Sequence, residues 1–177
     1  METISADMIA GGLLILRLVI GTLMMGHATQ KLFGWIGGYG LRGTAGFFEQ
    51  IGFRPGVLFA TAASLGELTS GLLVALGLFG PIGPALMISV MLVAMLAVHW
   101  SNGLFAATNG VEVPLLYATA ALGFALIGFG PYSLDALLGI GSVWTPAITL
   151  AVLGTGVAGA VGNLALRRLP AATPNRA

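Results

Sequence analysis

Five long apolar stretches, separated by short polar or glycine-rich segments, dominate the chain. They cover residues 8–26, 57–79, 82–100, 113–129 and 144–166. Each lies within the roughly 17–25 residues that a helix needs to cross a hydrocarbon core of about 30 Å. Helices are expected because a bilayer offers no water to hydrogen-bond a bare backbone. The pattern therefore predicts an all-α membrane protein with five spans.

The connecting segments add detail to this arrangement. A Gly-Pro pair at 80–81 separates the second and third stretches so closely that the two helices must form an antiparallel hairpin. A Thr-Pro pair at 145–146 is typical of a helix cap followed by a first-turn proline. Residues 34–55 are expected to form a loop that contains a short interfacial helix. The tail at 170–177 is expected to be disordered.

Positive charge predicts the direction of the chain. Six basic residues flank the spans, three before the second span and three after the fifth: Lys31, Arg42, Arg54, Arg167, Arg168 and Arg176. With five spans all six lie on one side of the membrane. Lys and Arg concentrate in cytoplasmic loops. We therefore expect a multi-pass protein of the cell membrane, in a bacterial inner membrane, with the N-terminus outside and the C-terminus in the cytoplasm.

Composition excludes several classes of function. The chain is 57% hydrophobic and only 7% charged, whereas soluble domains carry about 25% charged residues, so a lipid bilayer is the expected partner. A net charge of +1 with seven Lys and Arg argues against nucleic-acid binding. Because the chain has no cysteine, disulfides, iron–sulfur clusters and covalently attached haem are excluded.

Two charged residues lie near the middle of predicted spans. Arg17 is in the first span and Glu67 in the second. An unpaired charge at the bilayer centre would cost about 2.5–3.5 kcal/mol on insertion scales, and the similar depth of the two predicts an Arg17–Glu67 pair. Such a pair could belong to a polar cavity or proton path, or it could only fix the register of two helices. Both interpretations stay open.

A second polar group is expected at the cytoplasmic end of the bundle. Its members come from three different spans: His27, Lys31, His99, Asn102 and Glu112. Histidine titrates near neutral pH, and the lysine and glutamate offer complementary charges. The group suits an anionic or carbonyl-bearing ligand, or proton transfer. Taken singly, each residue could be an ordinary interfacial one, with the lysine snorkelling; taken together, they favour a functional cluster. No metal site is predicted, because the spacing does not establish that these ligand types converge.

Short motifs along the chain resemble the signature of the DoxX family of membrane proteins. The motifs follow the family's order through about residues 13–137: Leu16-Arg17-Leu18, His27-Ala28-Thr29-Gln30-Lys31, Gly43-Thr44-Ala45, Phe48-Glu49, Gly66-Glu67-Leu68, Gly71-Leu72-Leu73, Val98-His99, Asn102-Gly103 and Gly130-Pro131-Tyr132. The chain departs from the pattern at Ala28, where glycine is common, and at Leu104, where phenylalanine is common. A fifth span also lies beyond the family's core.

The resemblance implies a four-helix transmembrane bundle over residues 8–137, with a cytoplasmic loop at 28–56. Residues 144–166 would add a fifth, C-terminal transmembrane helix, and residues 167–177 a basic cytoplasmic tail. The resemblance also implies an association with redox chemistry, through quinone-linked oxidoreductases, resistance to quinones or catechols, and complexes with soluble oxidative-stress enzymes. Its motif residues, carried over by position, are Arg17, His27, Lys31, Glu67, His99, Asn102 and Glu112.

The leading hypothesis is a small redox-associated membrane protein, or a subunit of a quinone-linked oxidoreductase. It would bind a quinone or similar lipophilic acceptor near the cytoplasmic interface. His27, Lys31 and His99 would hydrogen-bond or protonate the quinone oxygens, with Glu112 orienting or exchanging protons and Asn102 in support. The sequence offers no redox centre of its own, so electrons would come from a partner or a bound cofactor.

Two other functions remain open. The chain could be a non-catalytic scaffold that recruits soluble oxidative-stress enzymes through residues 34–55. It could also be a small permease gated at Arg17 and Glu67. Four glycines in the last span could pack against another subunit of a homo-oligomer or against the bundle itself: Gly154, Gly156, Gly159 and Gly162.

Overall fold

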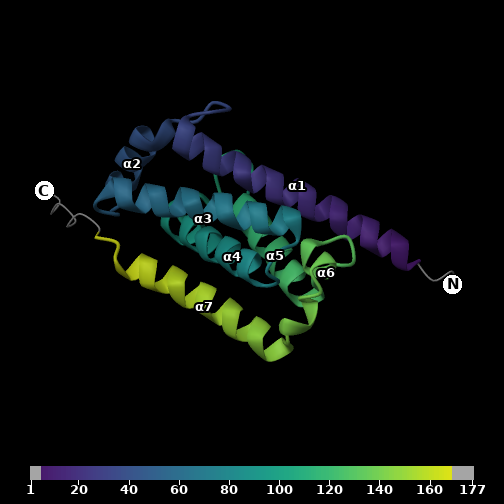
Figure 1. Cartoon of the computed structure of the whole chain (residues 1–177). Helices are drawn as coiled ribbons and strands as arrows, with labels where there is room; N and C mark the ends of the chain where they lie inside the picture. The colour runs from purple at the N-terminus through teal and green to yellow at the C-terminus, as the bar shows by residue number, and fades with distance from the viewer. Residues whose placement is uncertain (1–4, 169–177) are drawn as a thin grey trace, which may run out of the picture.

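The computed structural model describes residues 5–168, and within them the chain is helical with no β-strand. Five longer helices run roughly along one axis (Figure 1): α1 (Ala6–Phe33), α3 (Gly56–Leu76), α4 (Ile82–Ala94), α5 (Glu112–Ile127) and α7 (Pro146–Ala165). Two shorter helices cap the ends, α2 (Gly40–Gln50) at one and α6 (Leu134–Leu137) at the other.

Helix α1 is longer than the apolar run that predicted it. The run ends at Gly26, but the helix continues through His27 and Lys31 to Phe33. It stops at Gly34, whose φ of 75° is a left-handed C-cap. Polar residues end the hydrophobic pattern but not the helix. The midpoint of α1 therefore lies closer to its C-terminus than the midpoint of the apolar run.

The other helix boundaries follow the expected ones closely. The α-helix of α4 passes into a π-helical turn, Met95–His99, and then into a 3₁₀ turn, Trp100–Asn102. The predicted cap of α7 is confirmed, because Thr145 Oγ1 accepts the amide of Ile148 at 3.4 Å. The short helix expected within residues 34–55 is α2. The tail at 170–177, including Arg176, lies outside the described residues.

Among the described residues, four helical segments are long and apolar enough to cross a membrane: Ala6–Phe33, Gly56–Leu76, Ile82–Asn102 and Pro146–Ala165. Helix α5 has 16 residues, or about 24 Å at 1.5 Å per residue, which is short of a core of about 30 Å. Five spans are therefore not confirmed. The C-terminal helix α7 is long enough to cross a membrane. The helix that is too short is α5, which belongs to the four-helix bundle that the family resemblance implies. The direction of the chain, which rested on five spans, stays a prediction.

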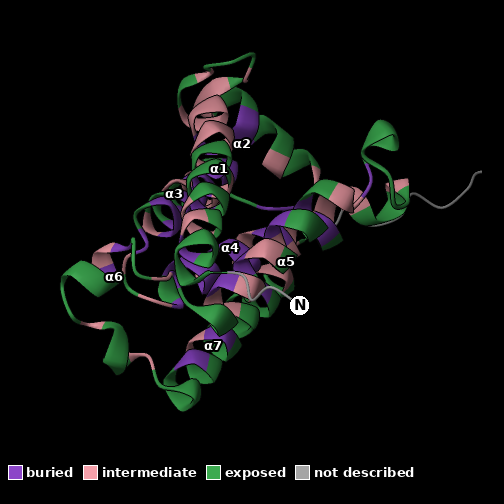
Figure 2. Ribbon diagram, turned by 90° about the vertical axis from the view of Figure 1, so that its right-hand side faces the viewer, coloured by how far each residue is buried: buried purple, intermediate pink, exposed green. Residues whose placement is uncertain are grey.

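Helix α4 lies at the centre of the bundle. It packs against α3, α5 and α7, whereas α1 packs mainly against α3. The outer faces of α1 and α7 are largely exposed, and buried residues face inward (Figure 2). Because these outer faces carry many large apolar side chains, they are suited to contact lipid.

Glycines set two close helix crossings. A Cβ at Gly21 of α1 would lie 2.5 Å from the carbonyl oxygen of Gly71 in α3. A Cβ at Gly156 of α7 would lie 2.5 Å from the carbonyl oxygen of Ala85 in α4. Small residues let helix backbones approach closely in membranes. Gly154 and Gly162 have no neighbour within 4 Å of an added Cβ, so the four glycines of α7 are divided between the bundle and the outside.

The Gly21 crossing can be tested by adding one methyl group. In Gly21→Ala the new Cβ meets backbone that cannot move aside, so we expect a loss of about 1–3 kcal/mol of stability. Gly12→Ala is the control, because its Cβ meets nothing within 4 Å on the same helix. Thermal unfolding in mild detergent should show a lower Tm for the first variant only. Equal Tm values would contradict the close crossing.

The absence of cysteine allows the number of crossings to be tested by single-cysteine labelling. Helices α2 and α6 lie at opposite ends of the bundle (Figure 1). We expect Arg42→Cys to react with an impermeant maleimide only from the cytoplasmic face, and Leu137→Cys only from the outer face. Labelling of both from one face would show that α5 fails to separate the two ends across the membrane.

Candidate functional site

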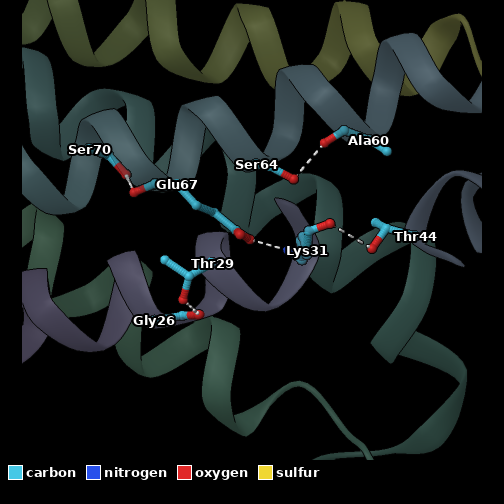
Figure 3. Close-up of polar contacts among 8 residues, drawn as sticks. All are labelled: Gly26, Thr29, Lys31, Thr44, Ala60, Ser64, Glu67 and Ser70. Atoms are coloured by element: carbon cyan, nitrogen blue, oxygen red, sulfur yellow. Dashed lines mark hydrogen bonds and ion pairs between the residues drawn. The ribbon is translucent and has the colours of Figure 1, made fainter. Parts of the chain in front are cut away.

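Glu67 forms an ion pair with Lys31, between α3 and the last turn of α1 (Figure 3). Lys31 Nζ donates to Glu67 Oε1. The glutamate is 1% exposed, while the lysine side chain keeps 30% of its surface accessible. The predicted Arg17–Glu67 pair is wrong, because within residues 5–168 the acid that Arg17 was expected to meet is held by Lys31.

The register of α1 against α3 explains this difference. The two helices are antiparallel, with Gly21 opposite Gly71 and with Arg17 against Gly77. This register brings the level of Glu67 near His27, ten residues or about 15 Å further along α1 than Arg17. Arg17 and Glu67 both lie near the centre of their apolar runs. Because α1 extends seven residues past the end of its run, a central place in the run does not put the two residues at the same level of the bundle.

Arg17 has a different environment near the opposite end of the bundle. It is 1% exposed, its Nη2 donates to the carbonyl oxygen of Tyr132, and its guanidinium lies 5.7 Å from the ring centroid of Phe129. A Cβ at Gly77 would overlap the guanidinium, so this glycine provides its space. Nε and Nη1 have no hydrogen-bond partner among the described residues. Arg17 thus fastens the connection between α5 and α6 to α1.

Two further residues complete the surroundings of Glu67. The rings of His27 and Tyr117 meet edge to face with centroids 5.7 Å apart, and Glu67 lies within electrostatic range of both. Glu67 Oε2 is buried and has no hydrogen-bond partner within residues 5–168. We call His27, Lys31, Glu67 and Tyr117 the core polar cluster. Tyr117 was not predicted from the sequence, although its lone phenol in the apolar run of α5 was an available signal.

His99 and Asn102 meet at one backbone carbonyl in the loop between α4 and α5. His99 Nδ1 lies 2.7 Å from the oxygen of Asn109, and Asn102 Nδ2 donates to the same oxygen at 3.2 Å. A carbonyl only accepts hydrogen bonds, so Nδ1 carries the proton here and Nε2 is the nitrogen left for other partners. Asn109 was also missed; the Asn-Gly pair at 109–110 is a turn signal.

Glu112 closes the same loop instead of joining the core polar cluster. Its Oε2 accepts the amide of Ala106 at 2.7 Å, and its own amide donates to the oxygen of Leu104 at 2.8 Å. The five residues predicted as one cluster are therefore divided among three places at the same end of the bundle. Across residues 5–168 no three His, Cys, Asp or Glu side chains are placed to hold a metal ion.

A cavity of about 940 Å³ connects two of these places. We call the part lined by Gln30, Lys31, Arg42 and His99 its polar end, and the remaining wall comes mainly from apolar residues of α2, α3 and α4. Lys31 thus faces the cavity while it bonds Glu67 behind the cavity wall. Neither His27 nor Glu112 lines this space.

Helix α2 covers the polar end of the cavity and is fastened on several sides. Thr44 Oγ1 donates to the oxygen of Lys31 at 3.4 Å, and Glu49 Oε1 accepts the amide of Gly56 at 3.0 Å. Just after the end of α7, Arg167 Nε donates to the oxygen of Ile51 at 2.6 Å. These bonds hold α2 over the bundle, so the cavity has a fixed roof.

The Lys31–Glu67 pair makes a clear prediction for stability. Lys31→Met leaves a buried carboxylate without its cation, which costs about 3–5 kcal/mol for a fully buried pair; partial exposure of the lysine puts the expected loss near the lower value. The double variant Lys31→Met/Glu67→Gln should recover most of the loss, because no charge remains buried. Thermal unfolding of the wild type, both single variants and the double variant gives the coupling. Strictly additive effects would contradict the pair.

Comparison with known proteins supports the motif resemblance. The DoxX family model matches residues 12–100, half of the chain. The match includes Arg17, the ion pair and His99, and it ends before Asn102 and Glu112. Neither the curated proteins nor the solved structures give a significant match. The chain therefore belongs to the DoxX family and is an apolar, helical membrane protein of that family.

Proposed function

We propose that this protein binds a lipophilic acceptor of the quinone class, with the head of the ligand beneath α2. The observation that carries the proposal is the cavity of about 940 Å³, which is mainly apolar but is also lined by Gln30, Lys31, Arg42 and His99. Ligand sites are commonly apolar spaces of about 300–1,000 Å³ with a few polar groups that fix orientation. A flat ring with two carbonyl oxygens meets both requirements.

Donors of this cavity match the oxygens of a quinone. Lys31 has three N–H donors and one is directed at Glu67, so others are available to a ligand oxygen. In its imidazolium form His99 can donate from Nε2 as well, since its Nδ1–H is already bound to the oxygen of Asn109. Gln30 lines the same space and supplies an amide. Together they can hold a carbonyl oxygen by hydrogen bonds.

The core polar cluster supplies a route for protons in this proposal. Lys31 touches both the cavity and Glu67, and His27, one turn before Lys31 on α1, contacts the ring of Tyr117. Groups that exchange protons can therefore follow one another from the cavity into the bundle. Arg17 is too far along α1 to take part and keeps a positioning role. The chemistry of electron transfer would come from a partner protein or a bound cofactor, which is the sense in which the protein is redox-associated.

His27 and His99 were predicted from the sequence to belong to one cluster, but we expect them to contribute differently to quinone affinity. With protein in mild detergent and a fluorescent quinone analogue, His99→Ala should weaken binding by about tenfold, the value of one good hydrogen bond to a ligand. His27→Ala should have a smaller effect, because its ring faces Tyr117 and does not line the cavity.

Glu112→Gln is the matched control for this assay. It alters a carboxylate at the same end of the bundle whose hydrogen bond is to the α4–α5 loop, so quinone affinity should stay unchanged. Absence of any quinone binding by the wild type, or equal losses in the His27 and His99 variants, would overturn the proposed site.

A scaffold role is the second candidate, and exposed apolar residues after α1 favour it. Trp35, Ile36 and Tyr39 are 60%, 77% and 87% exposed. Such a surface suits either the headgroup region of a bilayer or a soluble enzyme. Under the scaffold hypothesis, replacing Trp35 and Ile36 by serine abolishes capture of the partner while the His99→Ala variant behaves like the wild type; Tyr39 is kept because it also lines the cavity. Ligand binding predicts the opposite.

A further inference from the structure

The cavity continues from its polar end as a long apolar groove on the outside of α4. A stripe on one face of α4 and of the π-helical turn after it forms its floor: Leu86, Val90, Val93 and Ala97. The spacing of four, three and four residues keeps them on one side of a helix. Eleven residues separate the first from the last, or about 16 Å at 1.5 Å per residue. The groove therefore runs along much of a segment that is long enough to cross a membrane.

The groove exists because the two neighbours of α4 do not close over it. Helices α3 and α7 each pack against α4 but make at most a marginal contact with each other. Phe59 and Ala62 form the wall on α3, and Asn163 is the contribution of α7. The four floor residues are only half-buried although α4 is the central helix. Within a bilayer, the open side between α3 and α7 would face lipid.

The inner edge of the groove is shaped by a glycine. A Cβ at Gly66 would lie 2.9 Å from Cγ2 of Val90, so any side chain there would push into the floor. Glu67, the next residue, points to the other side of α3 and binds Lys31. Gly66 thus separates an apolar slot on one side of α3 from the core polar cluster on the other.

We infer that this groove binds the hydrocarbon tail of the ligand, which enters sideways from the bilayer between α3 and α7. The inference rests on the proposed function for the head group and adds the class of the ligand: a long-tailed isoprenoid or acyl lipophile, not a small water-soluble quinone. A narrow apolar channel lined by valine and alanine accepts a flexible chain, and Lys31 and His99 hold the head at its closed end. Val93 and Ala62 determine tail specificity.

The test compares one quinone head with and without a long isoprenoid tail. In lipid nanodiscs, the tailed quinone should bind the wild type at least about tenfold more tightly than the tail-less one, since each buried methylene contributes to affinity. Val93→Trp and Ala62→Leu should each remove most of this advantage and leave the tail-less affinity unchanged. Leu96→Trp is the matched control, because Leu96 is an exposed side chain of the π-helical turn after α4 and does not line the groove. Equal binding of both quinones by the wild type would overturn the inference.

Photolabelling separates this inference from the proposed function. A lipid-soluble isoprenoid alcohol that carries a diazirine on its tail should label α4 between residues 86 and 97, in the wild type and in Leu96→Trp but not in Val93→Trp. Labelling there without any quinone binding would retain the tail groove and reject the quinone head. Labelling confined to other faces of the bundle would reject the groove, whatever binds at its polar end. Ala62→Leu, at an exposed position, gives the same readout if Val93→Trp fails to fold.

Discussion

The cost of burying a charge in a bilayer organises this structure. Glu67 has almost no contact with solvent, and a carboxylate in hydrocarbon is tolerated only with a partner. Lys31 provides that partner from the far end of α1, and its long side chain can do so because helical side chains lean back toward the N-terminus. The pair fixes the antiparallel register of α1 and α3. It also requires α1 to remain helical well past its apolar run.

From this register follows the asymmetry of the bundle. The end at which α1 stops holds the core polar cluster, the roof helix α2 and the polar end of the cavity. The opposite end holds Arg17, whose guanidinium bonds the carbonyl of Tyr132 and packs on Phe129. The two buried charges of the family motifs therefore perform separate tasks. One fastens a connection, and the other is linked through Lys31 to a space that a ligand can enter.

The cavity depends on small residues at the helix crossings and on the near absence of contact between α3 and α7. Glycines at the α1–α3 and α4–α7 crossings bring backbones into contact, which leaves α3 and α7 apart on either side of α4. The resulting groove and the donors at its closed end form one continuous space. A ligand with a polar head and an apolar tail would place its head among polar side chains and its tail among apolar ones. This match links the proposed function to the inferred entry route.

The sequence by itself determined the membrane class, the helices and the family. A run of about twenty apolar residues is too costly to expose to water, so it predicts a membrane-spanning helix. The Thr145-Pro146 pair caps α7 through contacts with its own sequence neighbours. The sequence also selected Lys31, Glu67 and His99, since charges inside apolar runs are conspicuous. Only the tertiary structure decided which of them meet. Partner choice depends on the register between helices far apart in the chain, and that register depends on the glycine contacts at Gly21 and Gly71 and on a helix end that hydrophobicity does not mark. For the same reason Tyr117 and Asn109, ordinary residues in the sequence, became neighbours of the site.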